Sequence, residues 1–142
     1  MANNYTQFSV EFDVGSAENV EKAMKIFNDR QKEDHESYPD DGGWLGISVD
    51  NEVASNPANT ALWINSGDES GNPEAAIDFV TTVGKALKLK GKWGFSWADT
   101  CSKLRLNEFG GGAAVVDLKT GHVEFVNTYE WLHKKLNRKR AA

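Results

Sequence analysis

The sequence predicts an α+β protein in which helices cover one face of a mostly antiparallel sheet. Stretches in which apolar and polar residues alternate, typical of half-buried strands, recur along the chain. Between them lie stretches in which apolar residues recur at helical spacing. With 142 residues, 39% of them hydrophobic and 26% charged, the chain is expected to form a single domain over residues 1–142. The basic tail, about residues 137–142, is free to fray.

The first strand and the first helix follow from the spacing of apolar residues. Residues 7–14 alternate between polar and apolar side chains, which predicts a strand. Ser16 comes next as a candidate N-cap. From Val20 to Phe27 the apolar residues recur at helical spacing, and this helix is expected to end in the polar stretch near Asp34.

The middle of the chain predicts two strands and a second helix. Alternation over residues 45–49 and an apolar run over residues 60–65 predict strands joined by a loop. Asn72 and Pro73, followed by an acidic residue, form the clearest helix start in the chain. Gly91 is expected to end this helix.

The last third predicts three strands and a helix. Bulky aromatic residues alternate with small ones over residues 93–97, which predicts a strand with one very bulky face. Residues 113–118 and 122–126 flank a short glycine-containing loop and are expected to form a hairpin. Thr128 is a candidate cap for a last helix that reaches about Arg138.

The predicted order is therefore β-α-β-β-α-β, followed by β-β-α. The first six elements match the split βαβ, ferredoxin-like plan, a two-layer sandwich with both helices on one face of the sheet. The C-terminal hairpin strand and helix are expected to extend this sandwich. Because the architecture serves many unrelated functions, the fold alone indicates none of them.

Charge is divided unevenly along the chain. The formal net charge is −5, yet residues 1–79 hold 16 acidic and 4 basic residues, while residues 80–142 hold 5 and 12. Because a concentrated field steers association, we expect an acidic face that binds a basic protein surface or protein complex. The candidate residues of this face are Asp34, Glu36, Asp40, Asp41, Asp50, Glu52, Asp68 and Glu69. The alternative is a solvated surface on which the two halves neutralise each other.

These observations favour a non-catalytic interaction or regulatory module. One concrete form is an inhibitor of a nucleic-acid-handling complex, whose carboxylates take the places of phosphates. The acidic balance argues against a dedicated binder of duplex DNA, which must offset phosphate charge. The sequence predicts no cofactor and no metal site, because the acidic stretch around His35 lacks calcium-loop spacing. It leaves the oligomeric state open, a dimer included.

The aromatic strand suggests an alternative function. Residues 90–97, Lys-Gly-Lys-Trp-Gly-Phe-Ser-Trp, resemble the aromatic strand motif of RNA-recognition domains, in which basic and aromatic side chains contact bases. The resemblance implies a single-stranded RNA-binding module. Its candidate residues are Lys92, Trp93, Phe95, Trp97 and Arg105. A different interpretation is that the three aromatic side chains, which share one face, form core under the helices.

A further alternative is a small-ligand-binding protein or enzyme with a cleft near Cys101 and the glycine run that follows it. Cys101 could act as a nucleophile if His122 or His133 held it as a thiolate. The candidate anion-binding N–H groups belong to Gly110, Gly111 and Gly112. A buried structural cysteine, and a close backbone approach at the glycines, are the competing interpretations.

The sequence also bears on location. No apolar run approaches the roughly 20 residues that a membrane helix needs. Residues 1–5 lack the basic and apolar stretches of a signal peptide. Cys101 is the single cysteine, so no internal disulfide can form. We therefore expect a cytoplasmic protein with no membrane partner.

Overall fold

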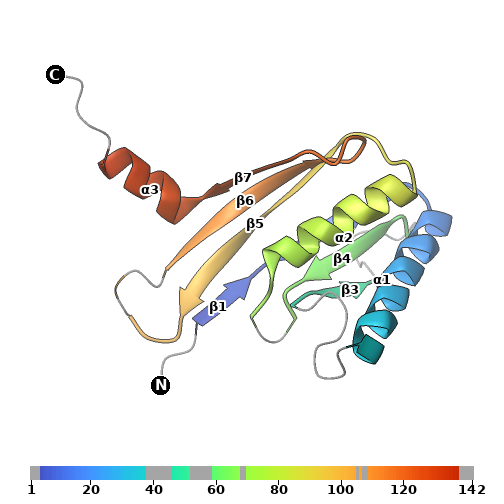
Figure 1. Cartoon of the computed structure of the whole chain (residues 1–142), viewed down its shortest axis with the longest axis horizontal. Coiled ribbons are helices and arrows are strands. Elements are labelled where there is room, and N and C mark those ends of the chain that lie inside the picture. Colours follow the sequence, from blue (N-terminus) through green and yellow to red (C-terminus); the bar gives the residue numbers. More distant parts are fainter. Residues whose placement is uncertain are drawn as a thin grey trace.

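The computed structural model describes residues 4–37, 46–51, 59–67, 70–104, 106 and 109–137, with side chains described for all of these except residues 33–37. Within those ranges the chain forms seven strands and three helices, which confirms the α+β class (Figure 1). In chain order the elements are β1 (Asn4–Gln7), β2 (Ser9–Asp13), α1 (Ala17–Ser37), β3 (Ser48–Asp50), β4 (Ala61–Asn65), α2 (Pro73–Ala86), β5 (Lys92–Cys101), β6 (Gly110–Asp117), β7 (Val123–Asn127) and α3 (Thr128–Leu136).

The described strands form two antiparallel sheets rather than the single predicted sheet. One sheet has the order β1-β5-β6-β7 and the other has the order β2-β4-β3. Only Phe8 separates β1 from β2, so the chain passes directly from one sheet into the other. The Phe8 N–H donates to Ser66 Oγ (3.3 Å) and its carbonyl accepts from Ser66 N (3.0 Å). Because these groups bond to a loop, the strand predicted over residues 7–14 is divided at Phe8.

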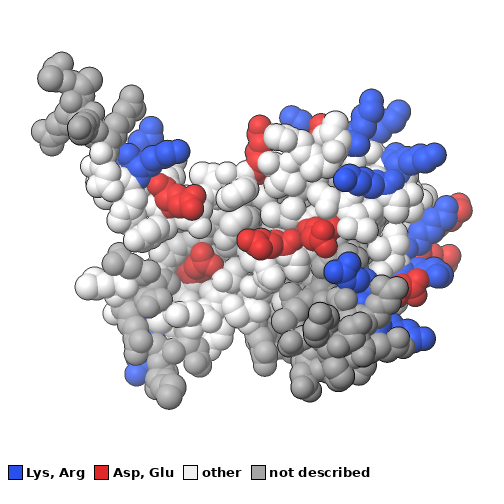
Figure 2. Space-filling view, viewed as in Figure 1, with Lys and Arg blue, Asp and Glu red and all other residues white. Residues whose placement is uncertain are grey.

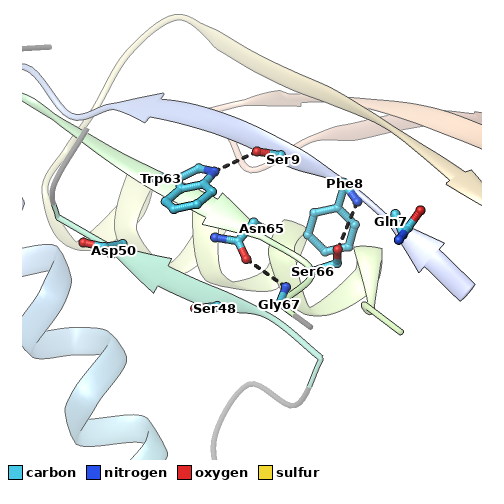
Figure 3. Close-up of a pocket in the computed structure, with 9 residues that line it drawn as sticks. All are labelled: Gln7, Phe8, Ser9, Ser48, Asp50, Trp63, Asn65, Ser66 and Gly67. Carbon is cyan, nitrogen blue, oxygen red and sulfur yellow. Dashed lines mark hydrogen bonds between the residues drawn. The ribbon is translucent and has the colours of Figure 1, made fainter. Parts of the chain in front are cut away.

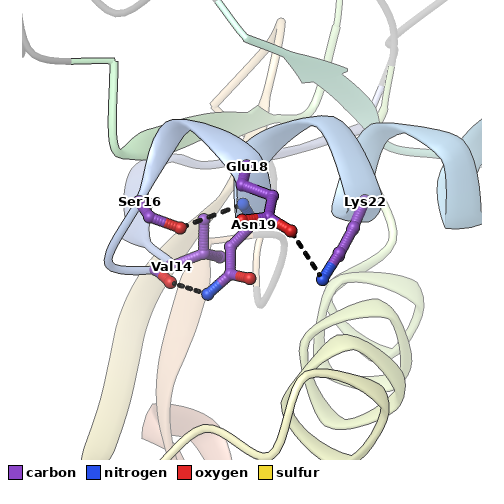
Figure 4. A network of polar contacts seen from close by, with 5 residues as sticks. All are labelled: Val14, Ser16, Glu18, Asn19 and Lys22. Atoms are coloured by element: carbon purple, nitrogen blue, oxygen red, sulfur yellow. Dashed lines mark hydrogen bonds and ion pairs between the residues drawn. The ribbon is translucent and has the colours of Figure 1, made fainter.

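The first helix begins at the residue that the sequence predicts. Ser16 Oγ accepts a hydrogen bond from Asn19 N (3.1 Å), and the Asn19 side chain donates to the Val14 carbonyl oxygen (2.8 Å) (Figure 4). An exposed ion pair between Glu18 and Lys22 (3.2 Å) lies one turn further on. The bond from Asn19 N to Ser16 satisfies a helix N–H group that would otherwise lack a partner. At its other end α1 runs to Ser37, beyond the predicted end near Asp34.

The second helix is capped as predicted but ends earlier. Asn72 Oδ1 accepts from the N–H groups of Glu74 (3.0 Å) and Ala75 (3.4 Å). The helix ends at Ala86, before the predicted end at Gly91. Lys88 adopts a left-handed φ of 55°, and its N–H bonds to the Lys85 carbonyl (3.3 Å) while Leu89 N bonds to the Gly84 carbonyl (2.9 Å). This hydrogen-bond pair defines a Schellman ending, with a lysine where glycine is usual.

The core lies between the strands and the two longer helices. Helices α1 and α2 lie on the same side of the strands (Figure 1), and Phe27 of α1 meets Phe79 of α2 edge to face at 5.6 Å. Trp93 and Phe95 of β5 stack at 5.1 Å, with exposed fractions of 8% and 7%. The Trp93 Nε1–H donates to the Glu11 carbonyl oxygen (3.0 Å). The interpretation of these two aromatic side chains as core is therefore confirmed.

The last helix departs from the predicted cap. Asn127, not Thr128, caps α3: its Oδ1 accepts from Glu130 N (3.2 Å). Thr128 Oγ1 instead donates to the Gly111 carbonyl oxygen (3.0 Å), which ties α3 to β6. No residue of α3 is buried, and Figure 1 shows this helix extending away from the body of the protein. Among the residues that the structure describes, no helix has both the length and the apolar character needed to cross a membrane.

Candidate functional site

A groove of about 770 Å³ separates α2 from β7 and the start of α3. We call it the α2–β7 groove. Its floor is apolar, and the four side chains that form it are Ile77, Trp97, Val123 and Phe125. Val123 and Phe125 face the groove because they pair with Val116 and Ala114, which are buried on the helix-covered side of the sheet. Phe125 remains 68% exposed, so the floor presents a large aromatic ring to solvent.

Trp97 has its place in the floor because of a glycine on the next strand. Gly112 lies opposite Trp97 in the β5–β6 pair. A Cβ at Gly112 would collide with the Trp97 ring and would lie 2.6 Å from the Val126 carbonyl oxygen. An aromatic ring can cover a strand glycine in this way because no side chain competes for the space. The close-approach interpretation of the glycine run is therefore confirmed at Gly112.

The other two glycines of the run belong to the same strand. Gly111 has a φ of +156°, and a Cβ there would collide with the Trp97 carbonyl oxygen. Gly110 lies opposite Asp99. Residues 110–112 thus begin β6 as part of its ladder with β5. An anion-binding loop would have its N–H groups directed to a common point, which a paired strand does not provide.

The rim of the α2–β7 groove is mainly acidic. Glu74 and Asp78 are one turn apart on α2, and Glu130 lies in the first turn of α3. Carboxylates near helix N-termini are favoured by the helix dipole. Lys85 is the basic residue that lines this groove, near Gly121 at the other end of α2. Figure 2 shows acidic groups over α2 and at the base of α3, with basic groups on α3 and around the far end of α2.

The acidic face predicted from the sequence falls mostly outside the description. Asp40, Asp41, Glu52, Asp68 and Glu69 lie outside the described residues, and the side chains of Asp34 and Glu36 are not described. Asp50 is the described member of the set. It is half-buried and lies opposite Trp63 in the β3–β4 pair.

Asp50 lines a second hollow, of about 650 Å³, on the side of the three-stranded sheet away from the core (Figure 3). Trp63 lies there with 42% of its surface exposed, and its Nε1–H donates to Ser9 Oγ (2.7 Å). Asn65 Oδ1 accepts from Gly67 N (2.8 Å) nearby. Several of the polar groups in this hollow thus bond to each other, which leaves fewer of them to bind a ligand.

The candidate RNA-binding residues are scattered by the fold. Trp93 and Phe95 are buried in the core, and Trp97 belongs to the floor of the α2–β7 groove. Lys92 is exposed at the other end of β5, opposite Asp117, and Arg105 lies outside the described residues. Stacking on bases requires exposed rings, so burial removes two of the three aromatic candidates from an RNA-facing surface.

The pKa of the Asp117 carboxyl lies below its ordinary value. The backbone N–H of Thr120 (3.2 Å from Oδ1) is the main cause that lowers its pKa, with desolvation opposing. The Lys119 N–H (3.0 Å), the Thr120 hydroxyl and the charge of Lys92 add to the lowering. The same hydrogen bonds close the β6–β7 turn, so this carboxylate has a structural role in the hairpin.

The fold does not bring His122 close to Cys101, as the thiol chemistry considered from the sequence would require. Cys101 is the last residue of β5. His122 precedes Val123, which pairs with Val116. Because Val116 pairs in turn with Trp93, His122 lies near the start of β5. At about 3.3 Å per residue these positions are roughly 25 Å apart along the sheet. The other candidate base, His133, packs its ring against Tyr129 at 4.1 Å. Within the described ranges no group of three or more His, Cys, Asp or Glu side chains could hold a metal ion.

Sequence reasoning missed the groove residues as a set. The sequence predicts Glu74 only as part of a helix start and Phe125 only as part of a hairpin strand, and it gives Asp78 no role. The alternation that puts Val123 and Phe125 on one face is visible in the sequence, but the strand register that aligns them with Trp97 is not.

Comparison with protein-family models, with curated proteins and with solved structures finds no match for this chain.

Proposed function

We propose that this protein is a non-catalytic interaction module that binds a basic, apolar segment of a protein partner in the α2–β7 groove. The observation that carries the proposal is the combination of an apolar floor with three rim carboxylates, those of Glu74, Asp78 and Glu130. An exposed apolar patch marks an interaction site, and the floor of this groove contains Trp97 and the exposed Phe125 ring.

The apolar floor of the groove beside α2 supports a peptide segment as its occupant. Amphipathic helices bind by placing their apolar face into such grooves, with anchors one turn apart. The carboxylates are arranged to attract Lys or Arg side chains at the edge of the bound segment and to repel acidic competitors. The basic partner predicted from the charge balance thus has a specific candidate site.

Three finer parts of the account are proposals as well. The antiparallel neighbours β2-β4-β3 and β1-β5 support a split βαβ, ferredoxin-like plan whose first strand is shared between two sheets. The single Cys101 supports a cytoplasmic location. Inhibition of a nucleic-acid-handling complex stays a prediction, because seven of the eight acidic-face side chains lie outside the description.

Fluorescence anisotropy with two labelled peptides tests the proposed function. One peptide is a synthetic amphipathic helix of leucine and lysine, and the other has glutamate in place of lysine. We expect only the basic peptide to bind, and we expect Glu74→Lys with Asp78→Lys to weaken its binding at least tenfold. The control is Glu18→Lys with Glu21→Lys on the exposed face of α1, which changes the net charge equally. Equal loss in both variants would show non-specific attraction and would contradict the proposal.

A further inference from the structure

The last helix of the chain has the properties that the α2–β7 groove requires of its occupant. We infer that the groove binds α3 of a second copy of this chain, so that two copies exchange their C-terminal helices. This inference rests on the proposed function, because it names the basic, apolar partner segment of the same groove.

The first argument is that α3 leaves much of its apolar surface exposed among the residues that the structure describes. None of its residues is buried. Tyr129, Leu132 and Leu136 are one turn apart or nearly so, and they are 48%, 47% and 69% exposed; Trp131 on the same helix is 55% exposed. A helix of nine residues is marginal by itself in water, because its stability comes mainly from packing of its apolar face. Four large exposed side chains on so short a helix therefore point to a contact with another surface.

The second argument is charge. The last turn of α3 carries His133, Lys134 and Lys135, and the sequence continues with three more basic residues at 138–140. The groove rim carries Glu74 and Asp78 on α2. Basic groups on α3 and acidic groups over α2 lie on the same face of the molecule (Figure 2). One copy thus presents both halves of a complementary pair, which a symmetric dimer can satisfy twice.

The third argument is size. At 1.5 Å per residue, α3 is about 13 Å long and α2 is about 21 Å long. The whole of a partner's α3 can therefore lie beside α2. A symmetric arrangement is reciprocal, since each copy provides one groove and one helix. Two helices and two grooves would bury the exposed Phe125, Leu132 and Leu136 side chains of both copies.

Reciprocal charge reversal tests the exchange, with masses measured by sedimentation velocity and by light scattering after gel filtration. The wild-type chain is expected to show a dimer with twice the 15.7 kDa chain mass. The variant Glu74→Lys with Asp78→Lys, and separately Lys134→Glu with Lys135→Glu, are each expected to dimerise at least tenfold more weakly. An equimolar mixture of the two variants is expected to regain the dimer, because opposite charges then face each other at both contacts.

Two matched variants on α1 serve as controls. Glu18→Lys with Glu21→Lys, and Lys22→Glu with Lys25→Glu, change the net charge equally on an exposed surface. They are expected to leave dimerisation unchanged, and circular dichroism melts check that every variant is folded.

Several results would overturn the inference. The first is a wild-type chain that keeps the single-chain mass up to about 1 mM, a concentration at which specific association would be visible. The second is a dimer that neither charge reversal weakens. The third is an equimolar mixture of the two variants that does not regain the dimer. A monomeric chain that still binds the leucine–lysine peptide would overturn the self-association but not the groove's proposed function. A wild-type chain that neither dimerises nor binds the leucine–lysine peptide would overturn both proposals.

Discussion

The indole ring of Trp97 lies across Gly112, its partner on the neighbouring strand, where a Cβ atom would collide with the ring. Trp97 continues the row of aromatic side chains on β5 beyond the buried Phe95, and the ring centroids of these two residues are 5.4 Å apart. The packing against Gly112 also fixes the tryptophan in the floor of the α2–β7 groove. The absence of a Cβ at Gly112 therefore determines where the Trp97 ring lies in the candidate binding site.

Gly112→Ala is expected to lower the free energy of unfolding by about 1–3 kcal/mol, the usual cost of an added group in a tightly packed site. Both the Trp97 ring and the Val126 carbonyl oxygen would have to move to accept the methyl group. Urea denaturation measures the change. In a Trp97→Ala background the same substitution is expected to cost less, since the ring is gone. Equal costs in both backgrounds would show that the ring and the glycine are not coupled.

Lys88→Gly is expected to raise the free energy of unfolding by about 0.5–1 kcal/mol. Lys88 has a φ of 55° at the end of α2, a conformation that glycine adopts without the steric cost of a Cβ. Thermal unfolding measures the gain. Lys90→Gly is the control, because Lys90 lacks a positive φ, and it is expected to give no such gain. A Lys88→Gly variant that melts below the wild type would contradict the assigned helix ending.

Asp117 is expected to add acid sensitivity to the β6–β7 hairpin. Because its folded-state pKa lies below the unfolded value of about 3.9, its stabilising effect is complete above that value. The effect is lost as the pH falls through the lower folded-state pKa. Unfolding free energies of wild type and Asp117→Asn, measured from neutral to strongly acidic pH, are expected to differ less as the pH falls. A constant difference at every pH would be inconsistent with this role.

The local elements could be predicted because each has a chemical signal of its own. Ser16 and Asn72 cap the helices that the sequence assigns to them. The alternation over residues 93–97 predicts both a strand and a common face for its aromatic side chains, and the core accepts two of the three. Propensity, capping and hydrophobic period act within a few residues, so they are readable without the fold.

The remaining features depend on contacts between distant residues. The break at Phe8 arises from hydrogen bonds to Ser66, which lies 58 residues away. The early end of α2 depends on a lysine in a left-handed conformation, which residue type does not predict. The residues that line the groove are brought together by the pairing of β5, β6 and β7 and by the position of α2, and none of these is visible in a short stretch of sequence. Charge counting found an acidic half of the chain, but it could not show that Glu74 and Asp78 lie beside an apolar floor.

The indole N–H signals of the five tryptophans test the groove most directly. In two-dimensional ¹⁵N–¹H NMR spectra, titration with the leucine–lysine peptide is expected to shift the Trp97 signal, because this ring lies in the groove floor. The Trp63 signal is expected to stay in place, because that indole lies in the separate hollow, where it donates to Ser9. A shift at Trp63 with none at Trp97 would contradict the proposed binding site.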